Sequence, residues 1–239
     1  MITVGTHNEN NRIAWLKMTL ASIPAGQRIL DAGAGEQQFK RFCSHLDYIA
    51  QDFAKYDGKG DNRGLQMSAW DQSSLHLVCD ISSIPEPDGS FDVIMCTEVL
   101  EHLPEPILAL REFSRLLKTD GLLVVTAPFC SLTHFAPYHF TSGYNSYFYQ
   151  KHLGEMGFEI LELTANGNYI EFLAQELHRL SWVAKKYCDV KMNCLQRVII
   201  SLALRVLQRL SLLDRSSSEL LCFGYHVLAR KKPCAAHVP

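Results

Sequence analysis

The sequence has no surplus of positive charge, no paired-cysteine motif and no apolar leader. With 23 Lys and Arg against 25 Asp and Glu, its 239 residues create no overall positive field to gather a nucleic acid. No C-x-x-C pair occurs, so reduced, buried thiols are expected at positions 43, 79, 96, 130, 188, 194, 222 and 234. The first 20 residues contain no basic start followed by a continuous apolar run. These absences predict a cytoplasmic protein and disfavour nucleic acid as its partner; they do not indicate an oligomeric state.

The order of apolar runs predicts one α/β domain over residues 1–239, with 47% hydrophobic residues and no internal repeat. Short apolar runs separated by helical segments are typical of crossovers in a parallel sheet. Helices are expected at 10–22, from about 37, and at 105–117, and strands at 28–31, 47–51, 75–79, 91–96, 121–127, 158–163 and 221–229. The mostly helical stretch at 170–218 is too long for an ordinary connection, which predicts an insertion before the last strand.

Glycines and acids gather at the predicted strand ends, where open α/β sheets bind their ligands. Gly33 and Gly35 would let the backbone approach a ligand, and the helix expected after them would offer N–H groups to a carboxylate. Asp31 precedes these glycines, while Asp52 and Asp80 end the second and third strands. One such acid alone would be a turn former or helix cap. Together they predict a nucleoside site, because carboxylates accept hydrogen bonds from ribose hydroxyls and exocyclic amines.

Three segments resemble motifs of the class I S-adenosylmethionine-dependent methyltransferases, of the type 11-like kind. They are ILDAGAGEQQF at 29–39, CDISSIPEPDGSFDVIMCTEVLEHLPEP at 79–106 and LLKTDGLLVVTAPF at 116–129. The resemblance covers about residues 25–164 and the last strand, CFGYHVLARK. It implies a Rossmann-like, doubly wound sheet of seven strands in the order 3-2-1-4-5-7-6, with the seventh strand antiparallel.

The same resemblance implies S-adenosylmethionine as methyl donor. Asp31 and Gly33 would line its methionine part, Asp52 would hold the ribose hydroxyls, and Asp80 with Ile81 would meet the adenine. The remaining cofactor-binding residues that it implies are Gly35, Phe53, Thr97 and Glu98. A nicotinamide-dependent oxidoreductase would need a third glycine, at a position that is Gln38 here. A non-catalytic binding subunit is a further alternative, although the acids and glycines of the pocket are all present.

Methyl transfer is an in-line displacement, so the protein must position the acceptor and take up its proton. His139 or His134 is the first choice for the general base if no metal is used, and either could instead be structural. Glu98, Glu101 and His102 with His139 also resemble the Mg²⁺ or Mn²⁺ site of ubiquinone-pathway and small-RNA 3′-terminal O-methyltransferases. The same EVLEH signature occurs widely among methyltransferases without a metal, so both interpretations remain open.

The segment HFAPYHFTSGYNSYFYQKHL at 134–153 is rich in aromatic residues, which suit a ring-shaped acceptor. This segment and GFEILELTANGNYIEFLAQEL at 157–177 resemble methyltransferases of bacterial surface polysaccharide and sugar biosynthesis. We therefore expect O-methylation of a small-molecule or sugar or glycan hydroxyl. Metal-assisted methylation of an RNA 2′-hydroxyl or of a quinol is the alternative reaction.

Residues 195–210 of the insertion combine a basic stripe with a broad apolar surface. The stripe consists of Arg197, Ser201, Arg205, Gln208 and Arg209. Three arginines argue against a membrane span. Such a helix would serve either as a lid on the sheet or as a peripheral membrane contact that reaches a lipid-linked acceptor.

Overall fold

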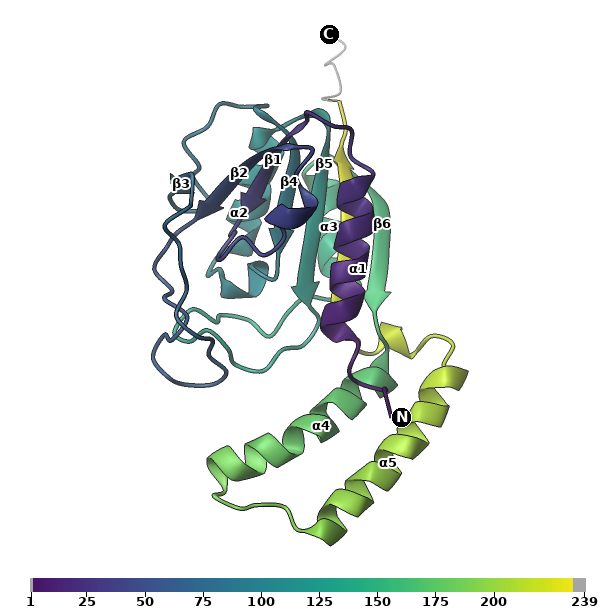
Figure 1. The fold of residues 1–239 in the computed structure, drawn as a ribbon. Helices are drawn as coiled ribbons and strands as arrows, with labels where there is room; N and C mark the ends of the chain where they lie inside the picture. Colours follow the sequence, from purple (N-terminus) through teal and green to yellow (C-terminus); the bar gives the residue numbers. More distant parts are fainter. Residues whose placement is uncertain (1, 234–239) are drawn as a thin grey trace. The chain divides into compact units, whose positions relative to one another are not determined.

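The computed structural model describes residues 2–233, which contain a seven-stranded sheet (Figure 1). The strands lie in the order β3-β2-β1-β4-β5-β7-β6, with β1 to β5 pairing in parallel and β7 antiparallel to β5. The predicted order and the antiparallel last strand are therefore confirmed. The strands are β1 Arg28–Ala32, β2 Asp47–Asp52, β3 Leu77–Val78, β4 Phe91–Thr97, β5 Leu117–Pro128, β6 Phe158–Asn166 and β7 Gly224–Lys231.

Helices cover both faces of the sheet, which explains why its central strands are almost continuously apolar. On helix α1 (Asn8–Ala21), Trp15 stacks on His226 of β7, with ring centroids 4.9 Å apart. On helix α3 (Ser146–Glu155), Tyr149 lies 6.2 Å from the ring of Tyr225. Because neighbouring residues of a strand point to opposite faces, α1 and α3 lie on opposite sides of β7.

The sequence of helix α2 (Pro106–Leu116) explains why this segment is helical. A proline stands at its first turn, where a missing N–H costs nothing. Its buried side chains then recur every three or four residues, as the packed face of a surface helix requires. They are Ala109, Leu110, Glu112, Phe113 and Leu116.

The expectation of a helix beginning near residue 37 is wrong. Gly35 and Gln37 both adopt left-handed backbone angles, with φ of 50° and 57°, which a right-handed helix cannot contain. Only a single 3₁₀ turn, Lys40–Phe42, follows. No α-helix in this part of the described chain therefore offers N–H groups to a ligand. The third strand is also shorter than expected, since β3 has two residues.

Residues 2–14 and 165–223 form a compact unit of their own, apart from residues 15–164 and 224–233. It contains helices α4 (Tyr169–Tyr187) and α5 (Cys194–Leu213), which occupy the helical stretch predicted at about 170–218. Val4, Ala174 and Leu204 make up its buried core. The side chain of Gln208 on α5 accepts hydrogen bonds from the backbone N–H groups of Thr3 and Val4, at 2.9 and 3.0 Å.

The cysteines of the described chain are reduced thiols, but only some are buried. Cys43, Cys96 and Cys222 are buried, whereas Cys130, Cys188 and Cys194 are exposed and Cys79 is intermediate. Cys234 lies outside the described residues. None of the helices in residues 2–233 combines the length and the apolar character needed to cross a membrane.

Candidate active site

A cleft of about 280 Å³ opens at the carboxyl ends of β1, β2 and β4. It brings together six of the predicted cofactor-binding residues, namely Gly33, Asp52, Phe53, Asp80, Ile81 and Glu98. The predicted residues Asp31, Gly35 and Thr97 are not among the lining residues. The shared edge follows from the parallel pairing of β1 with β2 and β4, which places their carboxyl ends side by side.

The turn after β1 is closed by close packing and by hydrogen bonds to β2. Gly33 has φ of 76°, and a Cβ there would lie 2.6 Å from a methyl group of Val99, so only glycine fits. The N–H groups of Gly33 and Ala34 both donate to the carbonyl oxygen of Gln51, at 2.9 and 2.8 Å. These bonds hold the turn against β2 without a following helix.

The Asp52 carboxylate is fixed by the backbone on both of its oxygens. Oδ2 accepts from the N–H of Gly35 at 3.0 Å, and Oδ1 accepts from the N–H of Ala54 at 2.9 Å. Each carboxylate oxygen has a second lone pair, so further donors can still bind. Asp52 lines the cleft while being only 5% exposed, which makes it a rigid acceptor. Gly35 thus acts through Asp52 rather than on the cleft directly.

Asp31 is buried at the end of β1 and is 2% exposed. Its Oδ2 accepts a hydrogen bond from the Tyr48 hydroxyl. Burial raises the pKa of Asp31 to about 7, although this hydrogen bond opposes the rise. The side chain therefore packs toward β2, next to the turn, rather than along the cleft wall.

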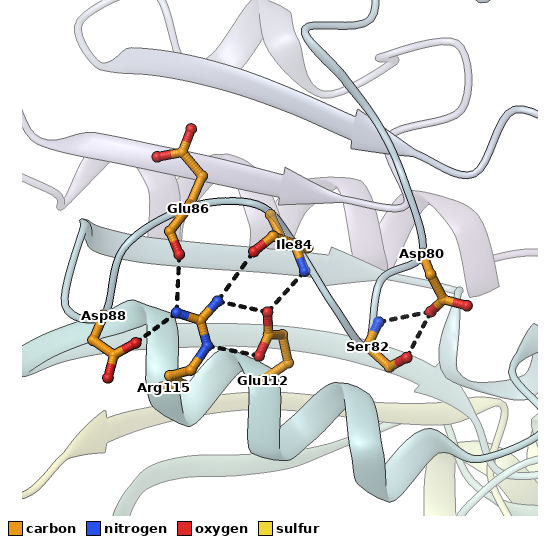
Figure 2. Close-up of polar contacts among 7 residues, drawn as sticks. All are labelled: Asp80, Ser82, Ile84, Glu86, Asp88, Glu112 and Arg115. Carbon is orange, nitrogen blue, oxygen red and sulfur yellow. Dashed lines mark hydrogen bonds and ion pairs between the residues drawn. The ribbon is translucent and has the colours of Figure 1, made fainter.

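The segment after β3 is held in place by one arginine, as Figure 2 shows. Arg115 of α2 donates two hydrogen bonds to Glu112, at 2.9 and 2.7 Å, and others to the carbonyl oxygens of Ile84 and Glu86 and to Asp88. Glu112 also accepts from the N–H of Ile84 at 2.8 Å. This network fixes the loop that follows the cleft residues Asp80 and Ile81. Sequence reasoning missed it; the i,i+3 spacing of Glu112 and Arg115 on a helix was the available signal.

We expect Arg115→Gln to lower the free energy of unfolding by about 2 kcal/mol, measured by urea denaturation. The change removes a forked set of hydrogen bonds and leaves Glu112 without its cation, while partial exposure of the guanidinium limits the loss. Arg115→Lys should recover little, because an ammonium cannot reproduce the fork. Lys118→Gln is the control, since its ion pair with Asp92 is exposed and should change stability by less than about 0.5 kcal/mol. If Arg115→Lys were as stable as the unchanged protein, the set of hydrogen bonds donated by the guanidinium would not contribute to stability.

Glu101 forms a second polar centre together with two histidines. It is completely buried, and neither carboxylate oxygen has a hydrogen-bond partner within the described chain. Nε2 of His102 and Nε2 of His134 each lie 3.7 Å from its Oε1. Their ligand atoms lie within 4.8 Å of one another, the spacing that a single metal ion requires. We call Glu101, His102 and His134 the Glu–His cluster.

Backbone carbonyls determine which imidazole nitrogens carry hydrogen in this cluster. Nδ1 of His102 contacts the carbonyl oxygen of Tyr138 at 2.5 Å, and Nδ1 of His134 contacts that of Leu132 at 2.8 Å. Because a carbonyl only accepts, each Nδ1 carries the proton, and each neutral ring turns its Nε2 lone pair toward Glu101. Three electron-rich groups therefore face one another, which favours a proton or a cation between them.

The pKa values in the cluster respond to burial and to Glu101. Burial lowers the pKa of His102 to about 3. Burial also acts to lower the pKa of His134, but the adjacent Glu101 carboxylate and the Leu132 carbonyl together outweigh it and the pKa is raised. Burial raises the pKa of Glu101 itself. His134 is therefore the imidazole of this pair that binds a proton more readily.

Two members of the predicted metal set, Glu98 and His139, are not grouped with the Glu–His cluster, although the ring of His139 lies 4.9 Å from that of His134. Glu98 lines the cleft, and its Oε1 accepts from the Thr126 hydroxyl at 2.8 Å. His139 contacts the Ser131 hydroxyl at 3.1 Å, and its ring centre is 6.0 Å from that of His102. The structure thus groups His134, rather than His139 or Glu98, with Glu101 and His102. Spacing along the chain could not distinguish two histidines in one irregular segment.

Aromatic rings form much of the remaining cleft wall. Two segments far apart in the sequence supply them, joined by hydrogen bonds of 3.0 Å from Leu65 to Thr133 and from Phe135 to Leu65. Phe135 stacks on both Tyr56 and His102, with centroids 4.7 and 5.0 Å apart. The six aromatic residues of the wall are Phe53, Tyr56, Trp70, Phe135, Tyr138 and Phe140. His102 belongs to both the cleft and the Glu–His cluster, so the two are continuous.

The aromatic segment predicted from the sequence divides between the cleft and the core. Phe135, Tyr138 and Phe140 line the cleft, whereas Tyr149 is fully buried under the sheet. Sequence reasoning missed Tyr56 and Trp70, because residues 53–76 contain no helix or strand to give them a periodic pattern.

Curated relatives match part of the chain. The ubiquinone biosynthesis O-methyltransferase of Xanthomonas oryzae pv. oryzae is 34% identical over 105 residues, 43% of this chain and 43% of that protein. The 2-methyl-6-phytyl-1,4-hydroquinone methyltransferase of Synechocystis is 28% identical over 112 residues, 44% of this chain and 33% of that protein. The chain thus matches less than half the length of each relative.

A solved structure shares the fold over nearly all of its length. The S-adenosylmethionine-dependent methyltransferase from Archaeoglobus fulgidus superimposes with a TM-score of 0.57 at 17% identity, covering 93% of this chain and 94% of that one. A family model described as a methyltransferase domain matches residues 6–163. This match includes the glycine turn, the cleft and the Glu–His cluster, and it covers more than half of the chain, so the chain belongs to this family of methyltransferase domains.

Proposed function

We propose that this enzyme methylates a hydroxyl group on an aromatic, quinol-like ring. The observation that carries the proposal is the continuity of the aromatic cleft wall with the Glu–His cluster through His102. A flat ring would stack against Phe135 and its neighbours while its hydroxyl reached the cluster. Beyond the acids expected to hold the cofactor, the wall is mostly aromatic and apolar, which suits an arene better than the sugar expected from the sequence.

Two relatives point the same way by their names, which refer to ubiquinone biosynthesis and to a hydroquinone. Their identity to this chain is confined to about 105 and 112 residues, so they support the substrate class as a proposal. Within that proposal, Gly33 and Asp52 would contact the methionine and ribose parts of the cofactor, and Asp80 and Ile81 its adenine; all four line the cleft.

The residues of the cluster supply the proton chemistry that a hydroxyl acceptor needs. In the reaction, the hydroxyl oxygen attacks the methyl carbon in line with the carbon–sulfur bond, and that bond breaks with its electron pair remaining on sulfur. We assign the acceptor's proton to Nε2 of His134, because Glu101 raises the pKa of this imidazole and stabilises its charged form. Glu101 and the Leu132 carbonyl would hold the ring in place during the transfer.

The Glu–His cluster also fits a divalent cation. Its carboxylate oxygens and the His102 Nε2 are buried without hydrogen-bond partners within the described chain, and the imidazole lone pairs converge on one carboxylate. Mixed carboxylate and imidazole ligands suit Mg²⁺ poorly and Mn²⁺ better, although both occur at such sites. Glu101, His102 and His134 would hold the ion, which would lower the pKa of the acceptor's hydroxyl.

The substrate class is tested by an acceptor screen that measures S-adenosylhomocysteine release. We expect turnover with catechols or reduced quinones and, at most, background release with sugar nucleotides, glycans and short RNAs. Each acceptor is assayed with and without added Mn²⁺, which tests the cation separately. Turnover confined to a sugar or an RNA would contradict the aromatic acceptor while leaving methyl transfer itself intact.

A further inference from the structure

Helix α5 carries apolar side chains on two different faces. On one, Leu204 is 5% exposed and packs in the small core with Val4 and Ala174. Roughly opposite, apolar positions recur every three or four residues and remain 46 to 76% exposed: Leu195, Ile199, Leu202, Val206, Leu210 and Leu213. We call these six residues the outer stripe. Nothing within residues 2–14 and 165–223 covers this face, although its apolar positions recur as regularly as those of a packed helix.

The outer stripe lies in the most basic part of the protein. Residues 177–213 contain seven of the 23 Lys and Arg residues but only one of the 25 acidic residues, so they are strongly cationic in a chain of net charge −2. On the α5 surface, Arg205 and Arg209 are exposed and lie beside the outer stripe. Lys185 and Lys186 near the end of α4, and Lys191 in the connection to α5, are also exposed.

Aromatic residues with polar edges accompany these charges. Trp182 and Tyr187 of α4 are 40 and 61% exposed. The Lys186 ammonium lies over both rings, 5.0 and 5.3 Å from their centroids. On α5 itself, an aliphatic stripe bordered by Arg205 and Arg209 matches the order of a lipid interface, from acyl chains to headgroups.

We propose that the unit containing α4 and α5 docks on an anionic lipid surface, with the outer stripe among the acyl chains and Arg205 and Arg209 at the headgroups. Charge complementarity favours an anionic lipid surface over a second copy of the chain. A second copy would place its own Arg and Lys residues against Arg205 and Arg209. Docking parallel to the surface also agrees with the finding that none of the helices in residues 2–233 is suited to cross a bilayer. The inference does not depend on the proposed acceptor.

The experiment measures co-sedimentation of the full chain with vesicles of phosphatidylcholine alone or mixed equally with phosphatidylglycerol. We expect binding to the anionic vesicles that added salt releases. Ile199→Glu with Val206→Glu should weaken it at least about 10-fold, because the introduced carboxylates oppose insertion. Arg205→Gln with Arg209→Gln should weaken vesicle binding about 25-fold, because each cation near an anionic surface contributes about fivefold. Arg205→Lys with Arg209→Lys should retain the binding, because the charge is kept.

Met18→Glu, at a 67% exposed position on α1, is the matched control and should bind vesicles like the unchanged protein. Circular dichroism and S-adenosylmethionine affinity, unchanged in every variant, show that the effects are not due to unfolding. The proposal is overturned if anionic vesicles are not bound, or if the Glu pair binds them undiminished. It is likewise overturned if sedimentation equilibrium finds a dimer that Ile199→Glu dissociates, since the stripe would then belong to a second copy.

Discussion

Replacing Glu101 by Gln should lower turnover about 100-fold while leaving the affinity for S-adenosylmethionine within about twofold. The amide has nearly the same shape, but it removes the charge that the two imidazole Nε2 atoms face at 3.7 Å. Without that charge, His134 loses the partner that raises its pKa, and a cation loses its anionic ligand. Initial rates of S-adenosylhomocysteine formation and calorimetric titration measure the two quantities separately.

A second readout separates the two roles proposed for this carboxylate. If a cation binds there, Mn²⁺ titration followed by electron paramagnetic resonance detects one site that Glu101→Gln abolishes, and chelation lowers turnover. If only proton transfer operates, turnover survives chelation but its acidic limb in a pH profile shifts to lower pH in the variant, because the pKa of His134 falls. Glu105→Gln is the control, since that exposed carboxylate lies four residues away in the same connection. If the Glu101→Gln enzyme were fully active, the Glu–His cluster would have no role in the mechanism.

Replacing Asp52 by Ala should weaken S-adenosylmethionine binding about 100-fold, on the order of 3 kcal/mol. The change removes the proposed acceptor for the ribose hydroxyls, and it also releases the N–H groups of Gly35 and Ala54, so the turn loses its fixed position. Asp52→Asn should be intermediate, because one oxygen remains to accept. Calorimetry on the folded variants checks both expectations.

Asp47→Ala provides a matched control for this change. Asp47 begins the strand that Asp52 ends, its side chain is 61% exposed, and its contact with Arg28 is a loose 3.8 Å pair. Cofactor affinity should therefore be unaffected. Equal affinities for Asp52→Ala and the unchanged enzyme would place the ribose away from β2 and would require a different assignment of the cleft.

The grouping of residues from the strand ends in one cleft was predictable because it depends on the sheet. Asp52 and Asp80 follow recognisable strands, and parallel pairing brings strand ends to one edge. Asp31 also ends a strand, yet its side chain packs against Tyr48, since a strand end fixes the position of a residue but not the partner of its side chain. The glycine turn was correctly located, whereas the helix after it was not, because nothing in the local sequence marks Gln37 as left-handed.

For the part of the site expected to bind the acceptor, the sequence predicted only which types of residue would be present. His134 and His139 lie in a segment without helix or strand, so no periodicity indicates which of them faces Glu101. Their placement depends on the pairing of Leu65 with residues 133 and 135, a contact between two irregular loops. Tyr56 and Trp70 reach the cleft by the same contact. Such pairings are set by tertiary packing, which a single sequence does not display.

The hydrogen bonds from Thr3 and Val4 to Gln208 join positions about 205 residues apart, and Gly5 donates at 2.6 Å to Glu171. A Cβ on Gly5 would lie 2.3 Å from the Gln175 nitrogen, so the segment fits closely against α4. During translation, these early residues leave the ribosome long before their partners have been synthesised. Their unit therefore assembles late, after strands β1 to β5 have had time to pair, while β7 is synthesised only after Gln208.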